Sequence, residues 1–244
     1  MTQGAELANS EESRWSTLLG QHMNQAVINL SQGGVSNATI VRTTVDYLLQ
    51  TGNHIEHVII GWTNSDRKEL SLCTGDWLYL TPQTHFVGDQ DLQGNPPESY
   101  REKLYHDWYR WHANAYNSVT ETLRNIMAVN AVCKHLGIKI TNFFAMPDTV
   151  FQFCTDPEEL KRVAQRWYRC FPLEDLNHRD PAIYIESQQN LQRMLDHLPR
   201  DSWFLWGSNL VDACRYFPHG PGLHPLEQAQ EFFAKQLYDH IRQR

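Results

Sequence analysis

The sequence predicts an α/β fold in which helices cover both faces of a mainly parallel sheet, a three-layer α/β/α arrangement. The first observation is the segment His57–Trp62, which reads His-Val-Ile-Ile-Gly-Trp and is apolar without alternation, as in a strand covered on both faces. The second is that strand-like runs alternate with stretches of helical periodicity, which favours parallel strands joined by helical crossovers. The chain has 244 residues, enough for one such core, so we expect a single domain over residues 1–244.

The amino-terminal part predicts a helix, a strand and a second helix before His57–Trp62. Apolar residues recur at helical spacing over residues 13–23. The short apolar run 26–30 is followed by a glycine pair, Gly33 and Gly34, as expected for a buried strand that ends in a turn. Ser36 or Asn37 then resembles an N-cap for a helix over residues 36–49.

The carboxyl-terminal part predicts an insertion and further strands and helices. Residues 71–136 form the insertion, which begins as an irregular stretch rich in Gly, Pro, Asp and Gln and becomes helical from about residue 100. Gly137 ends that helix. Beyond it we expect strands over 138–146 and 202–206, and helices over 158–170, 187–197 and 226–241.

Composition excludes several classes of protein. No apolar stretch is long enough to span a membrane, so we expect a soluble protein. The net charge of -7 gives no general attraction to a nucleic-acid backbone. The 5 cysteines are scattered and form no CxxC pair, which indicates neither a disulfide framework nor a zinc site. We therefore expect no cofactor, no nucleic-acid partner and a cytoplasmic location, in the host cytoplasm if the protein is viral; oligomeric state is not predicted.

The residues that follow the predicted strands are suited to acyl transfer. Open parallel sheets bind ligands at the carboxyl ends of their strands. There the backbone N–H of Gly34 and the side chain of Asn64 are suitable donors for an oxyanion, and a neutral imidazole at His224 is a suitable base. Structural interpretations stay open for each: Gly34 in a tight turn, Asn64 as a helix cap and His224 as a surface residue. Arg67 and Glu69 are interpreted as a solvated ion pair.

Three blocks in this order resemble the SGNH (GDSL-type) hydrolase family. The blocks span residues 29–34, 60–64 and 222–225, and the last is followed by the predicted tail helix. The likeness is to a phage-type branch of the family. In that branch the block that corresponds to residues 60–64 reads Gly-Trp-Thr and is followed by a nearby Arg-x-Glu, as in residues 61–69. The resemblance implies a flavodoxin-like sheet and a serine esterase or acyl hydrolase. It implies His224 as base, with Gly34 and either Asn64 or Thr63 as oxyanion donors, because the asparagine stands one place later than in the family.

Two departures from the family pattern concern the catalytic centre. Pro221 stands where the family has the aspartate that orients the histidine. Residues 1–7 resemble the residues that follow the family's serine, so the serine and the first strand are expected to fall immediately before Met1.

The resulting expectation is an esterase acting on a small-molecule, lipid or carbohydrate ester, which is inactive over residues 1–244 for lack of its nucleophile. The alternative is a non-catalytic module on the same fold that binds a glycan or an acyl group. A nucleotide or phosphate site at Gly33 and Gly34 is a weaker alternative, since no P-loop lysine follows.

Overall fold

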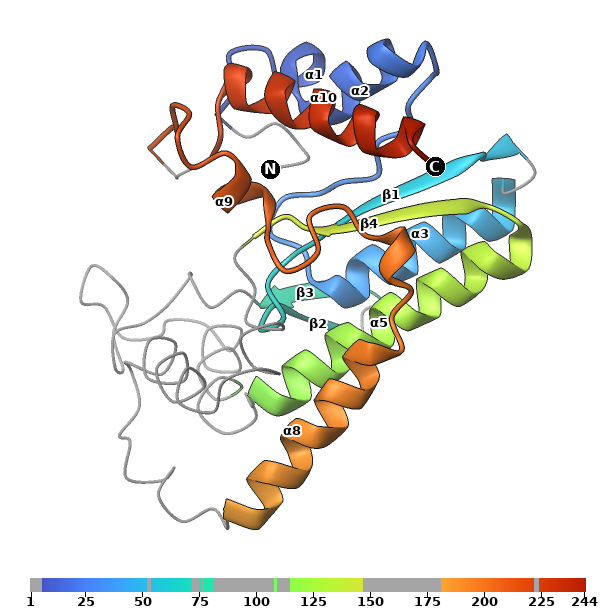
Figure 1. Cartoon of the computed structure of the whole chain (residues 1–244), viewed down its shortest axis with the longest axis vertical. Helices are drawn as coiled ribbons and strands as arrows, with labels where there is room; N and C mark the ends of the chain where they lie inside the picture. Colours follow the sequence, from blue (N-terminus) through green and yellow to red (C-terminus); the bar gives the residue numbers. More distant parts are fainter. Residues whose placement is uncertain are drawn as a thin grey trace.

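The computed structural model describes residues 6–51, 54–71, 75, 77–80, 108, 115–146, 181–221 and 224–244. It has a mixed α/β architecture with two small sheets (Figure 1). Strands β1 (His57–Trp62) and β4 (Lys139–Phe144) are parallel, whereas β2 (Lys68–Ser71) and β3 (Trp77–Leu80) form an antiparallel pair. The predicted α/β class is therefore confirmed.

The parallel pair is in register over its full length, from His57 opposite Lys139 to Trp62 opposite Phe144. On the far side of β4 the chain returns in two isolated parallel bridges, which join Asn142 to Trp203 and Phe144 to Asn209. The strand predicted over residues 202–206 is thus reduced to one bridged residue, after the 3-10 turn η4 (Arg200–Ser202).

Helices lie on both sides of the parallel strands (Figure 1). On one side are α3 (Asn37–Thr51), α5 (Ala115–Leu136) and α8 (Pro181–Asp196); on the other are α1 (Ser10–Ser13), α2 (Trp15–Met23) and α10 (Glu227–Arg242). The short helix α9 (Leu210–Ala213) precedes the loop that leads into α10. This arrangement gives the chain two apolar cores.

The two cores use alternate residues of the same strands. Ile60 and Trp62 of β1 pack in the core beneath α5, whereas Phe143 of β4 packs in the core beneath α2 and α10. In the second core the rings of Trp15 and Phe143 meet edge to face with centroids 5.5 Å apart, and Trp15 and Phe233 at 5.7 Å. Complete burial of each large apolar side chain stabilises the fold by about 1.5–3 kcal/mol.

Most of the expected elements are confirmed. The helix predicted over residues 13–23 is α2, the strand predicted over 138–146 is β4 and the tail helix is α10. Ser36 caps α3, because its Oγ accepts a hydrogen bond from the backbone N–H of Thr39 at 3.1 Å. Gly137 follows α5 at φ +70, the left-handed conformation common after helix ends.

The strand predicted over residues 26–30 is wrong. These residues pair with no strand among the described residues, and their apolar side chains point to solvent: Val27, Ile28 and Leu30 are 47%, 55% and 38% exposed. An apolar run becomes a strand only where a neighbouring edge accepts its hydrogen bonds, and here none does.

The insertion is irregular over less of its length than predicted, because its first part forms the β2–β3 pair. Residues 81–107, residues 109–114 and the helix expected over 158–170 lie outside the described residues.

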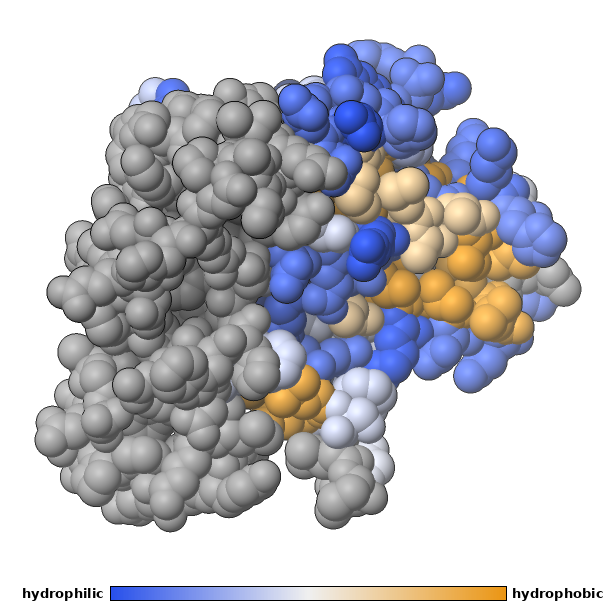
Figure 2. All heavy atoms as spheres, turned by 90° about the horizontal axis from the view of Figure 1, so that it is seen from below, coloured by the Kyte–Doolittle hydropathy of each residue, from blue (hydrophilic) through white to orange (hydrophobic). Residues whose placement is uncertain are grey.

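The lower face of the molecule carries apolar surface. Figure 2 shows the molecule from below, where apolar side chains are gathered between polar ones. Leu49 of α3 and Met127 and Leu136 of α5 are among the exposed large apolar side chains. No described helix is both long and apolar enough to cross a membrane.

Candidate functional site

Gly34 adopts a backbone conformation that other residues rarely take. Its φ is +76, and a Cβ added to it would meet no atom within 4 Å. The glycine is therefore required by the turn and not by crowding. Its position just before the cap of α3 leaves this stretch of backbone exposed at the end of the helix.

Asn37, the first residue of α3, ties that helix to the carboxyl end of β1. Its side chain is buried, and its Nδ2 donates to the carbonyl oxygen of Thr63 and to Oγ1 of Thr122, each at 3.1 Å. Its Oδ1 accepts the backbone N–H of Thr63 at 2.9 Å. Both backbone groups of Thr63 are thus occupied, so this N–H is not available to an oxyanion.

Asn64, unlike Thr63, has a polar group that is still free to bind a ligand. The residue is only 5% exposed, and its Oδ1 is buried without a hydrogen-bond partner. A half-turn of the amide exchanges its oxygen and nitrogen, so the same position can present a donor. Of the two donors left open by the sequence, the contacts favour Asn64 over Thr63.

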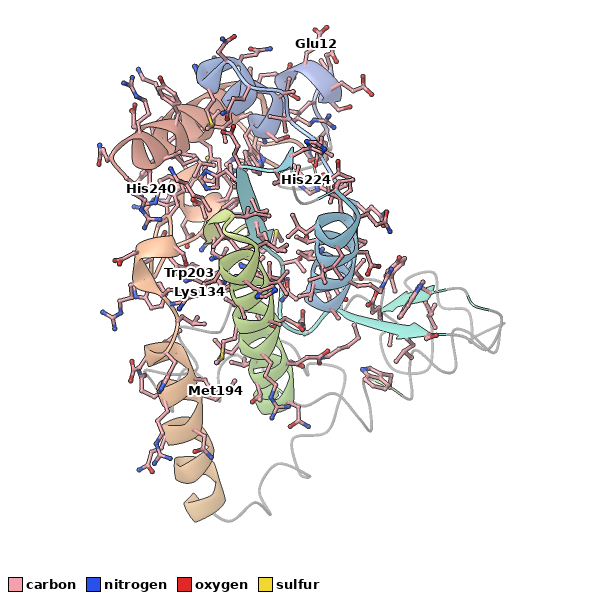
Figure 3. The ribbon with its side chains drawn as sticks, turned by 90° about the vertical axis from the view of Figure 1, so that its right-hand side faces the viewer. Glu12, Lys134, Met194, Trp203, His224 and His240 are labelled. Atoms are coloured by element: carbon pink, nitrogen blue, oxygen red, sulfur yellow. The ribbon has the colours of Figure 1, made fainter. Side chains whose placement is uncertain are left out.

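His224 lies in the loop between α9 and α10, in the upper half of the molecule with α1 and α2 (Figure 3). Its carbonyl oxygen accepts the backbone N–H of Gly220 at 2.9 Å, and the neighbouring Pro225 forms an antiparallel bridge with His219. The Nδ1 of His224 is buried and has no hydrogen-bond partner. Nothing among the described residues therefore orients the ring through that nitrogen.

Burial lowers the pKa of His224 below the usual 6.5, because the imidazolium loses solvation. Glu6 acts in the opposite direction and Arg67 in the same direction as burial. The ring is consequently neutral near neutral pH, which is the form that a general base requires.

The amino-terminal segment docks on this loop through two carboxylates. The backbone N–H of His224 donates to Oε2 of Glu6 at 3.2 Å, and the backbone N–H of Ala8 donates to Oε1 of Glu227 at 2.9 Å. The second bond lowers the pKa of Glu227. The two contacts run in opposite directions and hold the start of the chain beside His224.

The contacts of the described residues do not join the predicted site residues to one another. No hydrogen bond within the described part of the chain joins His224 to Gly34, Thr63 or Asn64. Arg67 links the two groups indirectly, because its N–H donates to the carbonyl oxygen of Asn64 at 3.3 Å and its charge lowers the pKa of His224. Residues 222–223 of the last block lie outside the described residues.

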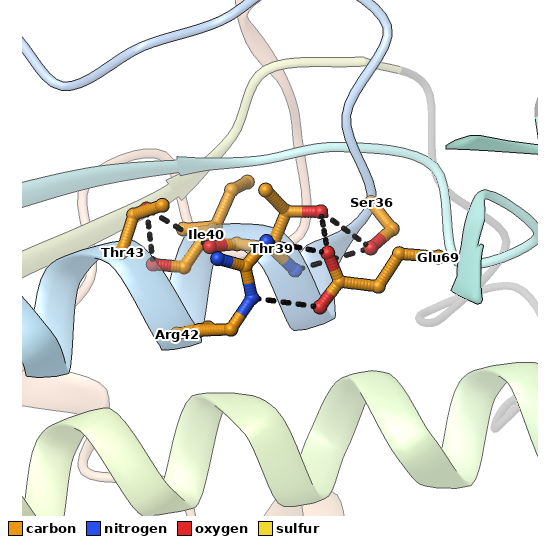
Figure 4. Close-up of polar contacts among 6 residues, drawn as sticks. All are labelled: Ser36, Thr39, Ile40, Arg42, Thr43 and Glu69. Atoms are coloured by element: carbon orange, nitrogen blue, oxygen red, sulfur yellow. Dashed lines mark hydrogen bonds and ion pairs between the residues drawn. The ribbon is translucent and has the colours of Figure 1, made fainter. Parts of the chain in front are cut away.

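The ion pair predicted between Arg67 and Glu69 is wrong, because Glu69 pairs with Arg42. Figure 4 shows the cluster: Glu69 Oε2 accepts from Nη2 of Arg42 at 2.9 Å and from Oγ1 of Thr39 at 2.6 Å. The Glu69 side chain is only 7% exposed, and the guanidinium lies 4.0 Å from the ring centroid of Trp77. These contacts fix the β2–β3 pair against α3, so the cluster is structural.

Two residues of the region were not found from the sequence. The sequence predicts Asn37 only as a possible helix cap. Its hydrogen bonds to Thr63 are not indicated by any pattern in the neighbouring sequence. Glu6 lies 218 positions from His224, so no spacing rule connects them.

The described residues contain no group of three or more His, Cys, Asp or Glu placed to hold a metal ion. Cys133 and Cys214 are free thiols within apolar cores, where burial raises the pKa of each to about 11. Neither is a reactive nucleophile. Comparison of the chain with protein-family models, with curated proteins and with solved structures finds no match.

Proposed function

We propose that this chain is a serine ester hydrolase of SGNH type, with a three-layer α/β/α fold, and that a serine N-terminal to Glu6 completes its site. The observation that carries the proposal is the loop of His224. A neutral imidazole with a buried, unpartnered Nδ1 lies directly beside the amino-terminal segment, which is where the family resemblance expects the nucleophile to enter.

The open edge of β1 supports the same proposal. Among the described residues no strand pairs with β1 on the edge opposite β4, and the apolar segment 26–30 is exposed and unpaired. A strand between the two would bury Val27, Ile28 and Leu30 and satisfy the backbone groups of both neighbours. The family resemblance expects a first strand, carrying the serine, that the described residues lack.

In the proposed reaction the serine Oγ attacks the ester carbonyl carbon while His224 accepts the hydroxyl proton. The oxyanion that forms is stabilised by the backbone N–H of Gly34 and the side-chain amide of Asn64. His224 then gives its proton to the departing alcohol, and water hydrolyses the acyl-enzyme with the same histidine as base. The substrate class is an ester of a small molecule, a lipid or a carbohydrate.

The test begins with the codons upstream of Met1. An in-frame Gly-x-Ser block allows an extended protein to be produced, and this protein is expected to hydrolyse a short-chain aryl ester. His224→Ala should lower kcat by about 10²–10⁴-fold, since a general base contributes that much. His219→Ala is the matched control, because His219 lies in the same loop and is assigned no role.

Full activity in His224→Ala would remove the histidine from the mechanism. An in-frame stop codon directly before Met1 would contradict the catalytic proposal for this product. It would leave the alternative, a module that binds a glycan or an acyl group in the same region.

A further inference from the structure

We propose that Glu6 is a positioning carboxylate for His224 and supplies, through the loop backbone and through its charge, part of the role for which Pro221 has no side-chain acceptor. The assignment rests on the proposed function for its catalytic meaning, but the pairing itself is a property of residues 6–244. Glu6 does not touch the reacting atoms. It acts through His224, by fixing the backbone of the loop and by placing a negative charge beside the ring.

Glu6 contacts His224 through a hydrogen bond to its backbone. Oε2 of Glu6 accepts the backbone N–H of His224 at 3.2 Å, so the carboxylate lies at the residue that carries the base. The bond spans 218 positions of sequence and joins the two ends of the chain. A carboxylate that accepts a backbone N–H forms a stronger bond than a neutral acceptor does.

Gly220 provides the space for this carboxylate. A Cβ added at Gly220 would lie 2.7 Å from Oε2, 2.8 Å from Cδ and 3.0 Å from Cβ of Glu6. Gly220 is not among the glycines with positive φ, so its backbone does not require glycine. A side chain at position 220 would therefore have to displace the side chain of Glu6.

Two charged side chains of the described residues act on the imidazole, Glu6 from the amino-terminal segment and Arg67 from the loop after β1. Burial, the charge of the amino-terminal ammonium and Arg67 disfavour the imidazolium, whereas Glu6 favours it. When His224 accepts a proton from the nucleophile, the charge of the Glu6 carboxylate favours the cation that forms. Stabilisation of that cation is the electrostatic part of what the family's aspartate supplies.

The pairing also makes the base dependent on docking of the amino-terminal segment. The bond from Ala8 to Glu227 holds the same segment at a second point, and its acceptor lies at the first turn of α10. A nucleophile that precedes Glu6 and a base beside Glu6 would thus be aligned by one short stretch of chain.

The test measures the pKa of His224 by NMR titration of the imidazole protons in the protein of residues 1–244, with the resonance assigned by its loss in His224→Asn. Glu6→Gln keeps a side-chain oxygen to accept the backbone N–H but removes the charge. We expect Glu6→Gln to lower the pKa of His224, and Glu6→Asp to leave it closer to the original value. An unchanged pKa in Glu6→Gln would overturn the proposal, because a purely structural contact survives this substitution.

Gly220→Ala provides an independent perturbation. It should displace Glu6 and lower the pKa of His224 in the original chain, but should have no further effect in a Glu6→Ala background. Equal shifts in both backgrounds would contradict the shared-space argument. The charge-matched control is Glu231→Gln, which removes a carboxylate beside His22 on the surface of α10 and should not affect His224.

The two proposals fail separately. If the extended protein hydrolyses esters and Glu6→Gln changes neither the pKa of His224 nor the pH profile of kcat, the role of Glu6 is wrong and the proposed function stands. If Glu6→Gln shifts the pKa but the extended protein has no activity, the pairing is right and the proposed function is wrong.

Discussion

The two halves of the candidate site are built in different ways. The donor half, Gly34 and residues 63–64, is fixed by Asn37, which makes three buried hydrogen bonds that cross from α3 to β1 and α5. The base half is held by backbone contacts of its loop, among them the bonds of His224 to Gly220 and to Glu6, and its ring nitrogen Nδ1 has no partner.

The two halves therefore differ in which contacts hold their backbones. In the donor half, both backbone groups of Thr63 are held by the side chain of Asn37. Each half also has one polar atom that is buried without a partner, Oδ1 of Asn64 in the donor half and Nδ1 of His224 in the base half, and such groups cost free energy unless something else completes them. These two atoms are therefore the points at which each half is not satisfied by the described residues.

The largest expected effect is on the donor half. Asn37→Ala removes three hydrogen bonds and leaves both backbone groups of Thr63 buried without a partner. We expect a loss of about 3 kcal/mol in the free energy of unfolding, measured by urea denaturation. Asn190→Ala, at a bond of 3.4 Å on the surface of α8, should change it by less than about 0.5 kcal/mol. Equal losses would mean that Asn37 has no special role.

A smaller effect is expected at Gly34. Gly34→Ala should cost about 1 kcal/mol, because the strain lies in the backbone and a Cβ meets no neighbour. Gly61→Ala provides the contrast, since its Cβ would lie 2.7 Å from Cζ of Phe143, and overpacking of this kind costs about 1–3 kcal/mol. A loss at Gly34 well above that at Gly61 would indicate crowding at the turn.

The smallest effect is the contribution of the base half to acid stability. Burial lowers the pKa of His224 and also that of His57, the latter from 6.5 to about 4. Below pH 6.5 the unfolded chain therefore binds protons that the folded protein does not, so stability falls as pH falls from 6.5 towards 4. His57→Gln should remove more of this loss than His224→Gln, because Glu6 offsets part of the effect at His224.

Unfolding free energies at about pH 7.5 and about pH 4.5 measure this pH dependence. A larger change for His224→Gln than for His57→Gln would contradict the account of the base half.

The elements that were predicted correctly are those whose signals are local. β1 is a continuous apolar run, and α10 has an apolar face at helical spacing that packs on α2. Ser36 caps α3 as its sequence context suggests. In each of these cases the sequence pattern that predicts the element lies within the element itself.

The errors and omissions involve partners that are distant in sequence. Residues 26–30 have the composition of a strand, but a strand requires a paired edge, and no described strand provides one. Glu69 bonds to Arg42, 27 positions away, and not to its near neighbour Arg67. The contact of Glu6 with His224 depends on where the two ends of the chain meet, which no local pattern contains.

The central claim is that His224 activates a serine that lies N-terminal to Glu6. The most direct measurement is labelling of the extended protein with a fluorophosphonate probe, followed by mass mapping of the modified peptide. We predict one labelled serine N-terminal to Glu6, with labelling lost in His224→Ala and kept in His219→Ala. No labelling, labelling at Ser36 or Ser65, or labelling that persists in His224→Ala would contradict the claim.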